Sequence, residues 1–76
     1  MRDFSTRFGA TVRHLREARG WSQERLAGCA DLNRSYIGEI ERATAIPSLV
    51  TAVKLAQALD VPLSQLISRC EESTAT

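Results

Sequence analysis

Apolar residues recur along this chain at the three- and four-residue spacing of helices, and no stretch shows the two-residue alternation of a strand. The first predicted helix covers about residues 4–19 and carries a single apolar stripe: Phe4, Phe8, Val12 and Leu15. Gly20 then ends the helix. Gly9 inside the helix costs about 1 kcal/mol relative to alanine, and we interpret it as a point where a neighbouring helix comes close.

A short second helix, over about residues 23–29, begins at the cap Ser22. Trp21 before this cap and Leu26 after it have the spacing of a hydrophobic staple. Two short capped helices joined by a three-residue turn predict a helix-turn-helix at about residues 22–42.

The second of these two short helices opens with the cap Asn33, and Leu32 and Ile37 repeat the staple. Its first turn carries Arg34, although the N-terminus of a helix already bears partial positive charge. This placement favours a negatively charged partner outside the chain.

Two more helices are predicted in the last part of the chain. Ser48 caps the first of them, whose apolar residues are spaced for burial: Leu49, Val53, Ala56 and Leu59. Residues 60–62 break it, and a short final helix has Pro62 in its first turn and three apolar positions: Leu63, Leu66 and Ile67. The pattern predicts an all-α, compact five-helix domain over residues 1–69 and a polar tail over residues 70–76.

The composition fits one globular domain. The chain has 76 residues, of which 43% are hydrophobic and 25% are charged. It contains no apolar span of about 20 residues, and its first residues, MRDFSTRFG, lack the apolar core of a secretory signal. We therefore expect a cytoplasmic protein without a membrane segment.

Residues that carry catalytic or metal chemistry are sparse. Cys29 and Cys70 have no nearby histidine, which leaves too few ligands for a metal site, and a reducing compartment favours free thiols. His14 lies in a basic helical stretch, and we interpret it as solvent-facing. The sequence shows no cluster of a nucleophile, a base and an orienting acid, and it has no glycine-rich phosphate loop. We expect neither enzymatic activity nor a cofactor.

Net charge gives a mixed signal about a nucleic-acid partner. The formal charge is only +1, whereas DNA-binding domains are commonly basic. Residues 1–42 nevertheless hold eight arginines against six acidic residues, and residues 43–76 hold two basic and three acidic residues. Nine of the ten basic residues are arginine, whose planar fork fits phosphate and guanine. The charge pattern permits DNA binding without establishing it.

Three segments together carry a family resemblance: LREARGWSQERLA (15–27), DLNRSYIGEIER (31–42) and PSLVTAVKLAQALDV (47–61). At this spacing the chain resembles the Xre/Cro/C1-type helix-turn-helix transcriptional regulators of bacteria and phages, over about residues 8–66. The resemblance implies a lambda-repressor-like fold. The small size and the NRSYIGEIER core look most like the stand-alone controller proteins of restriction–modification systems.

The resemblance implies that the chain binds double-stranded DNA, with its third helix in the major groove. The residues at the matching DNA-binding positions are Gln23, Asn33, Arg34, Ser35, Tyr36, Glu39 and Arg42. Gln23, at the start of the second helix, would contact a phosphate, or it is only a good helix former after a cap. Arg34 would donate two hydrogen bonds to a guanine.

The other matching positions have more than one interpretation. Ser35 would bond a base edge or a phosphate, and Tyr36 would pack on a thymine methyl group or reach a phosphate. Glu39 would accept from a cytosine amino group, or it holds Arg34 or Arg42 in place. Arg42 would contact a phosphate, or it complements the negative end of its own helix.

The resemblance also implies a structural role for two further residues. Arg16 and Glu41 match a partly buried ion pair that ties the first helix to the end of the third, and removing one partner of such a pair costs about 3–5 kcal/mol. Two residues depart from the family pattern, which has glycine at both positions. Asp31 tolerates a left-handed backbone, whereas Ala43 is a poorer left-handed cap.

One domain offers a single helix to a few base pairs, so we expect a homodimer on a palindromic operator. The candidates for the dimer interface are Leu63 and Ile67, because Leu59 and Leu66 fit the core better. No small-molecule sensor is visible in the sequence. The alternative function is a protein-interaction module of the same fold, an antitoxin or anti-repressor, for which the near-zero net charge is the main argument.

Overall fold

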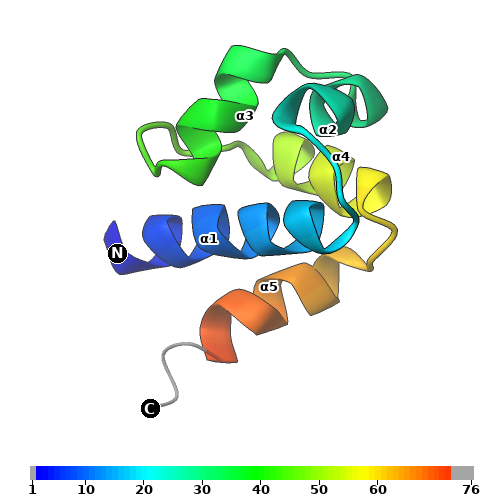
Figure 1. The fold of residues 1–76 in the computed structure, drawn as a ribbon. Coiled ribbons are helices and arrows are strands. Elements are labelled where there is room, and N and C mark those ends of the chain that lie inside the picture. Colours follow the sequence, from blue (N-terminus) through cyan, green and yellow to red (C-terminus); the bar gives the residue numbers. More distant parts are fainter. Residues whose placement is uncertain (1, 73–76) are drawn as a thin grey trace.

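The computed structural model describes residues 2–72, and five helices account for most of them. In chain order the helices are α1 (Arg2–Ala18), α2 (Gln23–Ala30), α3 (Arg34–Glu41), α4 (Leu49–Ala58) and α5 (Leu63–Glu72). The helix α1 runs through the middle of the molecule, with α2 and α3 on one side and α5 on the other (Figure 1). Residues 2–72 contain no strand, so the predicted all-α, five-helix fold is confirmed.

One hydrophobic core joins the helices. Every helix contributes at least one side chain with no solvent exposure: Val12, Leu26, Ile37, Leu55, Leu66 and Cys70. Burying each of the larger of these side chains stabilises the fold by about 1.5–3 kcal/mol. The predicted stripe of α1 faces this core, because Phe8 is buried beside Val12, and Phe4 and Leu15 pack at the edge.

The helix α1 passes α3 at Gly9, which is buried. A Cβ atom on Gly9 would lie 2.9 Å from the carbonyl oxygen of Glu41 and closer still to that of Ile40. Only a residue without a side chain lets the two backbones approach in this way. The predicted role of Gly9 is therefore confirmed.

All three predicted N-caps are present. The side-chain oxygens of Ser22, Asn33 and Ser48 each accept a hydrogen bond from the backbone N–H three residues later, at 3.0, 2.8 and 3.1 Å respectively. Each bond satisfies one backbone donor that the first turn of a helix leaves free. The starts of α2, α3 and α4 are therefore fixed by single polar residues.

The first four helices end in one common motif. Each is followed by a residue with a left-handed backbone, namely Gly20, Asp31, Ala43 and Asp60, with φ of 69°, 57°, 61° and 59°. In each case the next N–H reaches back five residues to a carbonyl of the helix, as from Thr44 to Glu39 at 2.9 Å. Ala43 thus adopts the conformation that the family's glycine would supply, despite a penalty of about 1–2 kcal/mol.

The face that α4 buries agrees with the prediction at Ala56 and at Leu59, which follows the helix, but differs from it in the first half of the helix. Leu49 is 72% exposed and Val53 is half-buried, whereas Thr51 and Ala52 face the core beside Leu55. The segment LVTAVKLAQA is apolar on most of its sides, so its periodicity did not define one buried face.

The last helix is longer than predicted, and the tail begins later. Cys70, assigned to a polar tail, lies within α5 with no solvent exposure. Arg7 of α1 donates a hydrogen bond to the Cys70 carbonyl at 2.9 Å, which ties the end of α5 to the start of the chain. The remaining tail positions, 73–76, lie outside the described residues. Pro62 immediately precedes α5, and its carbonyl accepts the first helical hydrogen bonds.

Candidate nucleic-acid interface

The helices α2 and α3 form a helix-turn-helix whose inner side is firmly anchored. Leu26 and Ala27 of α2 are buried against Ile37 and Ile40 of α3. The turn is closed by the N–H of Leu32, which donates to the Ala27 carbonyl at 2.9 Å. These contacts hold α3 in a fixed orientation and leave its other side to solvent.

The solvent side of α3 carries most of the predicted base-contacting side chains. Arg34, Ser35 and Glu39 are exposed, and Tyr36 is half-buried against the core. Within residues 2–72, the side chain of Arg34 makes no hydrogen bond or ion pair, and Glu39 forms no ion pair with Arg34 or Arg42. The alternative in which Glu39 holds either arginine therefore does not describe this structure.

Asn33 stands at the start of α3 with its side-chain oxygen already engaged. That oxygen accepts the hydrogen bond from Tyr36 N–H, while the residue itself is exposed. The amide NH₂ of Asn33 points away from this bond and remains a possible donor. The structure thus gives Asn33 a capping function beside its predicted contact with DNA.

A bidentate ion pair joins α1 to the end of α3. Arg16 Nε donates to Glu41 Oε2 at 2.7 Å and Arg16 Nη2 to Glu41 Oε1 at 3.1 Å, with the two side chains 11% and 3% exposed. The hydrogen bond from Arg16 to Glu41 raises the pKa of the guanidinium above its ordinary value, against the opposing effect of burial. A third donor, Arg16 Nη1, reaches the Trp21 carbonyl at 2.7 Å. The ion pair implied by the resemblance is present in the structure.

Gln23 belongs to the same network, which the sequence did not reveal. Its Nε2 donates to Glu41 Oε1 at 3.1 Å, so the first residue of α2 is tied to the last residue of α3. A side-chain amide has two N–H donors, and one of them is left for an anion. No spacing rule pairs these two residues, because their contact depends on how the two helices cross.

The side chains of Arg42 and Gln23 both lie beside Gly38, a proximity that their spacing in the sequence does not indicate. A Cβ atom on the buried Gly38 would lie 3.0 Å from Arg42 Nη1 and 3.7 Å from Gln23 Oε1. The Arg42 guanidinium therefore folds back over α3 toward the N-terminus of α2. Two of the predicted phosphate-contacting residues thus have side-chain atoms beside the same glycine of α3.

The arginines near the end of α1 and in α2 have partners within the protein. Arg13 pairs with Glu17 at 3.1 Å, and Arg19 Nη2 donates to the Leu59 carbonyl at 2.6 Å. The guanidinium groups of Arg19 and Arg25 lie 5.3 and 5.1 Å from the centre of the Trp21 ring, within cation–π range. Arg19 and Arg25 thus flank Trp21 between α1 and α2, Arg19 also reaches the end of α4, and the Arg13 pair lies within α1.

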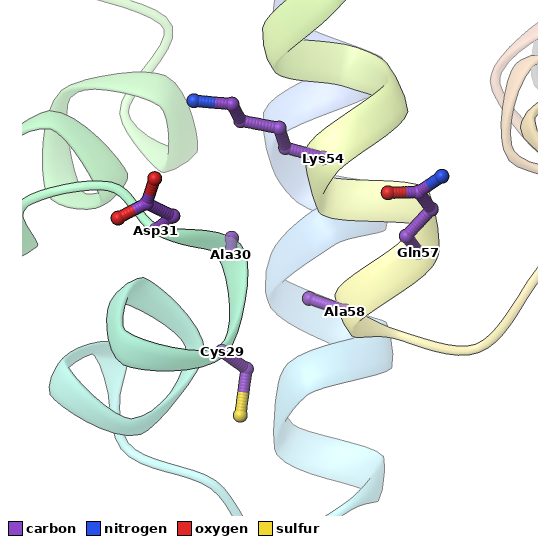
Figure 2. A pocket seen from close by; sticks show the side chains of 6 residues that line it. All are labelled: Cys29, Ala30, Asp31, Lys54, Gln57 and Ala58. Atoms are coloured by element: carbon purple, nitrogen blue, oxygen red, sulfur yellow. The ribbon is translucent and has the colours of Figure 1, made fainter.

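A depression of about 320 Å³ lies between α2 and α4 (Figure 2). It is lined by Cys29, Ala30, Asp31, Lys54, Gln57 and Ala58. Both cysteines are free thiols, as the sequence predicted, with Cys29 exposed here and Cys70 buried. Burial raises the pKa of the Cys70 thiol, which makes it the less reactive of the two.

Two other classes of site find no support in the described residues. No group of three or more His, Cys, Asp or Glu side chains within residues 2–72 could hold a metal ion. Likewise, none of the five helices in this range is long and apolar enough to cross a bilayer. His14, as predicted, is exposed.

A family model described as helix-turn-helix matches residues 12–66, which include the whole of α2, α3 and α4. The chain belongs to the helix-turn-helix family of DNA-binding transcriptional regulators. The resemblance inferred from the sequence is thereby confirmed. The relatives are regulators and controller proteins, a family without enzymatic activity.

Among the relatives are controller proteins of about the same length. Control protein C.BamHI of Bacillus amyloliquefaciens is 41% identical over 71 residues, which cover 86% of this chain and 88% of that protein. A solved structure, the restriction-modification controller protein C.AhdI of Aeromonas hydrophila, aligns with a TM-score of 0.79 and 47% identity, over 82% of this chain and 94% of that chain. The regulator SutR of Escherichia coli is 35% identical over 97% of this chain, which spans only 42% of SutR.

Proposed function

We propose that this protein regulates transcription by binding a palindromic operator as a homodimer, with the N-terminal half of α3 in the major groove of each half-site. The proposal rests on the difference between the two sides of α3. Its inner side is buried, and Arg34 and Glu39 stand exposed on the other side without a partner among the described residues. A helix that is held rigidly on one side and offers polar groups on the other suits base recognition.

The proposal assigns a DNA partner to each polar side chain on the outer side of α3, with two alternatives for Ser35 and for Tyr36. Arg34 donates two hydrogen bonds to O6 and N7 of a guanine, which discriminates by about 1–3 kcal/mol against another base. Glu39 accepts from a cytosine amino group. Ser35 bonds a base edge or a phosphate, and Tyr36 packs on a thymine methyl group or reaches a phosphate.

Gln23 and Arg42 hold the phosphate backbone beside the groove. Arg42 Nη1 and Gln23 Oε1 both lie next to Gly38, so the two side chains face one location between α2 and α3. The backbone N–H groups at the start of α2 add partial positive charge there. We propose that the guanidinium of Arg42 and the remaining amide N–H of Gln23 bind the same phosphate group.

The similarity to C.BamHI and C.AhdI supports a role as controller of a restriction–modification system. Such a chain has one domain to read DNA, and two domains related by a two-fold axis would read a palindrome with half-sites about 10 bp apart or a multiple of it. Regulation would then follow from protein concentration, through dimerisation and occupancy of the operator.

The decisive experiment is selection of bound duplexes from random DNA, with the wild type, Arg34→Ala and Arg69→Ala in parallel. Arg69 is an exposed arginine of α5, on the far side of α1 from α3 (Figure 1), so its substitution is the matched control. We expect an enriched palindrome that Arg34→Ala degrades at one position in each half-site, with affinity reduced about 5- to 150-fold.

Two outcomes would contradict the proposal. Weak, strongly salt-dependent binding without an enriched sequence would mean that the protein does not read a specific operator. Salt-insensitive capture of a protein partner with no DNA binding would instead support the antitoxin or anti-repressor function.

A further inference from the structure

Gly38 lies in the middle of α3 and is buried, although the residues one helical turn before and after it are exposed. Arg34, Gly38 and Arg42 follow one another at four-residue spacing and therefore lie along one row of the helix surface. Glycine inside a helix is destabilising relative to alanine, because it loses more backbone freedom on folding. The contacts proposed above do not use Gly38, so another feature must explain why a glycine stands there.

Neither backbone geometry nor helix packing accounts for this glycine. Within residues 2–72, Gly20 is the one glycine with a left-handed backbone, so Gly38 has a φ that alanine adopts without strain. At Gly9 the atoms nearest to an added Cβ are backbone atoms of another helix, whereas at Gly38 all three are side-chain atoms, of Arg42 and Gln23. Two residues of the proposed DNA interface therefore border the space that the missing side chain leaves.

The guanidinium of Arg42 lies closest to this space. An added Cβ on Gly38 would be 3.0 Å from Arg42 Nη1, which is shorter than the ~3.5–4.0 Å of an ordinary contact between non-bonded carbon atoms. Its distances to Arg42 Cζ and to Gln23 Oε1, both 3.7 Å, are ordinary. The Gln23 amide is also fixed on its other side, where Nε2 donates to Glu41 at 3.1 Å. A methyl group on Gly38 would thus displace Arg42 and leave Gln23 in place.

We propose that Gly38 is a positioning residue for DNA binding, whose missing side chain lets the Arg42 guanidinium lie over α3 before DNA arrives. The proposal deepens the proposed function and rests on the phosphate contact assigned there to Arg42. A long side chain loses rotamer freedom when it binds, and a guanidinium that already lies in place loses less of it. The main chain contributes as well, because the Arg42 N–H donates to the Gly38 carbonyl at 3.0 Å.

This role predicts opposite effects of Gly38→Ala on stability and on DNA binding. Alanine is the better helix former, and the group that its methyl crowds is the far end of a flexible side chain, which moves away at little cost. The fold should therefore become more stable. DNA binding should weaken, because the displaced guanidinium must be brought back to its phosphate. A glycine that served only folding would change both properties in the same direction.

The test measures DNA affinity by fluorescence anisotropy for the wild type, Gly38→Ala and Gly28→Ala, on the selected operator and on an unrelated duplex. We expect Gly38→Ala to bind both duplexes about three- to tenfold more weakly, because a phosphate contact does not depend on sequence. Gly28→Ala is the matched control, since nothing lies within 4 Å of its added Cβ, and it should bind as the wild type does. Both variants should raise the melting temperature, by about 2–8 °C.

A second pair of variants shows whether the effect passes through Arg42. In the Arg42→Gln background, adding Gly38→Ala should cause no further loss of affinity, because no guanidinium remains to be displaced. A further loss there would overturn the inference, since DNA itself would then crowd the methyl group. A changed operator sequence selected by Gly38→Ala would also overturn it, because Gly38 would then lie against a base.

The outcomes separate this inference from the proposed function. If the wild type selects a palindrome and Gly38→Ala binds it equally well, the positioning role of Gly38 fails and the proposed function stands. If the wild type selects no sequence but binds duplex DNA, and Gly38→Ala weakens that binding, operator recognition fails and the positioning role stands. A wild type that binds no duplex at all would overturn both.

Discussion

At the scale of single residues, two glycines that read alike in the sequence have opposite surroundings. Gly9 is buried where α1 crosses α3, with backbone oxygens of α3 in the place of a Cβ atom. Gly28 lies in α2, and nothing comes within 4 Å of its missing Cβ. The cost of adding one methyl group should therefore differ in sign between them.

We expect Gly9→Ala to lower the free energy of unfolding by about 2 kcal/mol or more, because a methyl group would push α1 off α3. Gly28→Ala should raise it by about 0.5–1 kcal/mol, because alanine is the better helix former where space is open. Urea unfolding of both variants measures the difference. Equal effects of the two substitutions would contradict the close approach at Gly9.

Single polar residues were also the most predictable part of the fold. Ser22, Asn33 and Ser48 were assigned as caps from sequence alone, and all three make the expected hydrogen bond. A cap depends on residues within one turn, so local sequence suffices to identify it. Leu49 could not be placed in the same way, since α4 is apolar on most sides and only the packed structure selects its buried face.

At the scale of helices, the orientation of α3 depends on one buried carboxylate. Glu41 accepts two hydrogen bonds from Arg16 of α1 and one from Gln23 of α2, and so connects three helices. The sequence indicated the Arg16–Glu41 pair only through the family resemblance. It did not indicate the bond from Gln23, because contacts between residues far apart in the chain follow from helix crossing.

We expect Glu41→Gln to destabilise the protein by about 3 kcal/mol or more, because it leaves the buried Arg16 without its counter-charge. The comparison is Glu17→Gln, which breaks the exposed pair with Arg13 at 3.1 Å and a longer contact with Arg16 at 3.9 Å. It should change stability by about 1 kcal/mol at most, because the Glu17 side chain is 54% exposed. Chemical denaturation of both variants provides the comparison.

The double variant Arg16→Met with Glu41→Leu tests the reason for this loss. It removes both charges from the buried site and should recover most of the stability that Glu41→Gln loses. Its DNA affinity should stay below that of the wild type, because Gln23 would no longer be tied to the end of α3. A double variant as unstable as Glu41→Gln would show that packing, and not the unpaired charge, causes the loss.

At the scale of the whole molecule, the net charge of +1 raises the question of how the chain would hold a polyanion. Only some of the arginines are bound to partners within the protein, and the others remain available to an anion. Arg13 and Arg16 are paired with acidic residues within the protein, and Arg19 bonds a backbone carbonyl. Arg34 and Arg42, in contrast, are exposed at the two ends of α3 and form no ion pair with another described residue. Affinity for phosphates should therefore rest on few side chains.

This distribution predicts different consequences for the two arginines of α3. Arg42→Gln should weaken binding to all DNA sequences alike and should make the dependence of affinity on salt less steep, by about one unit for each half-site. Arg34→Ala should weaken binding mainly to the selected operator, because its proposed partner is a base. Fluorescence anisotropy titrations at several salt concentrations, on the operator and on an unrelated duplex, distinguish the two effects.

Arg69→Gln, in α5 on the far side of α1, is the control for this experiment and should leave the salt dependence unchanged. Two other results would contradict a phosphate contact by Arg42. If Arg42→Gln relaxes sequence preference while the salt dependence stays constant, Arg42 contacts a base, and its position over Gly38 serves base recognition. If neither quantity changes, Arg42 lies outside the DNA interface, and its guanidinium only complements the negative end of α3.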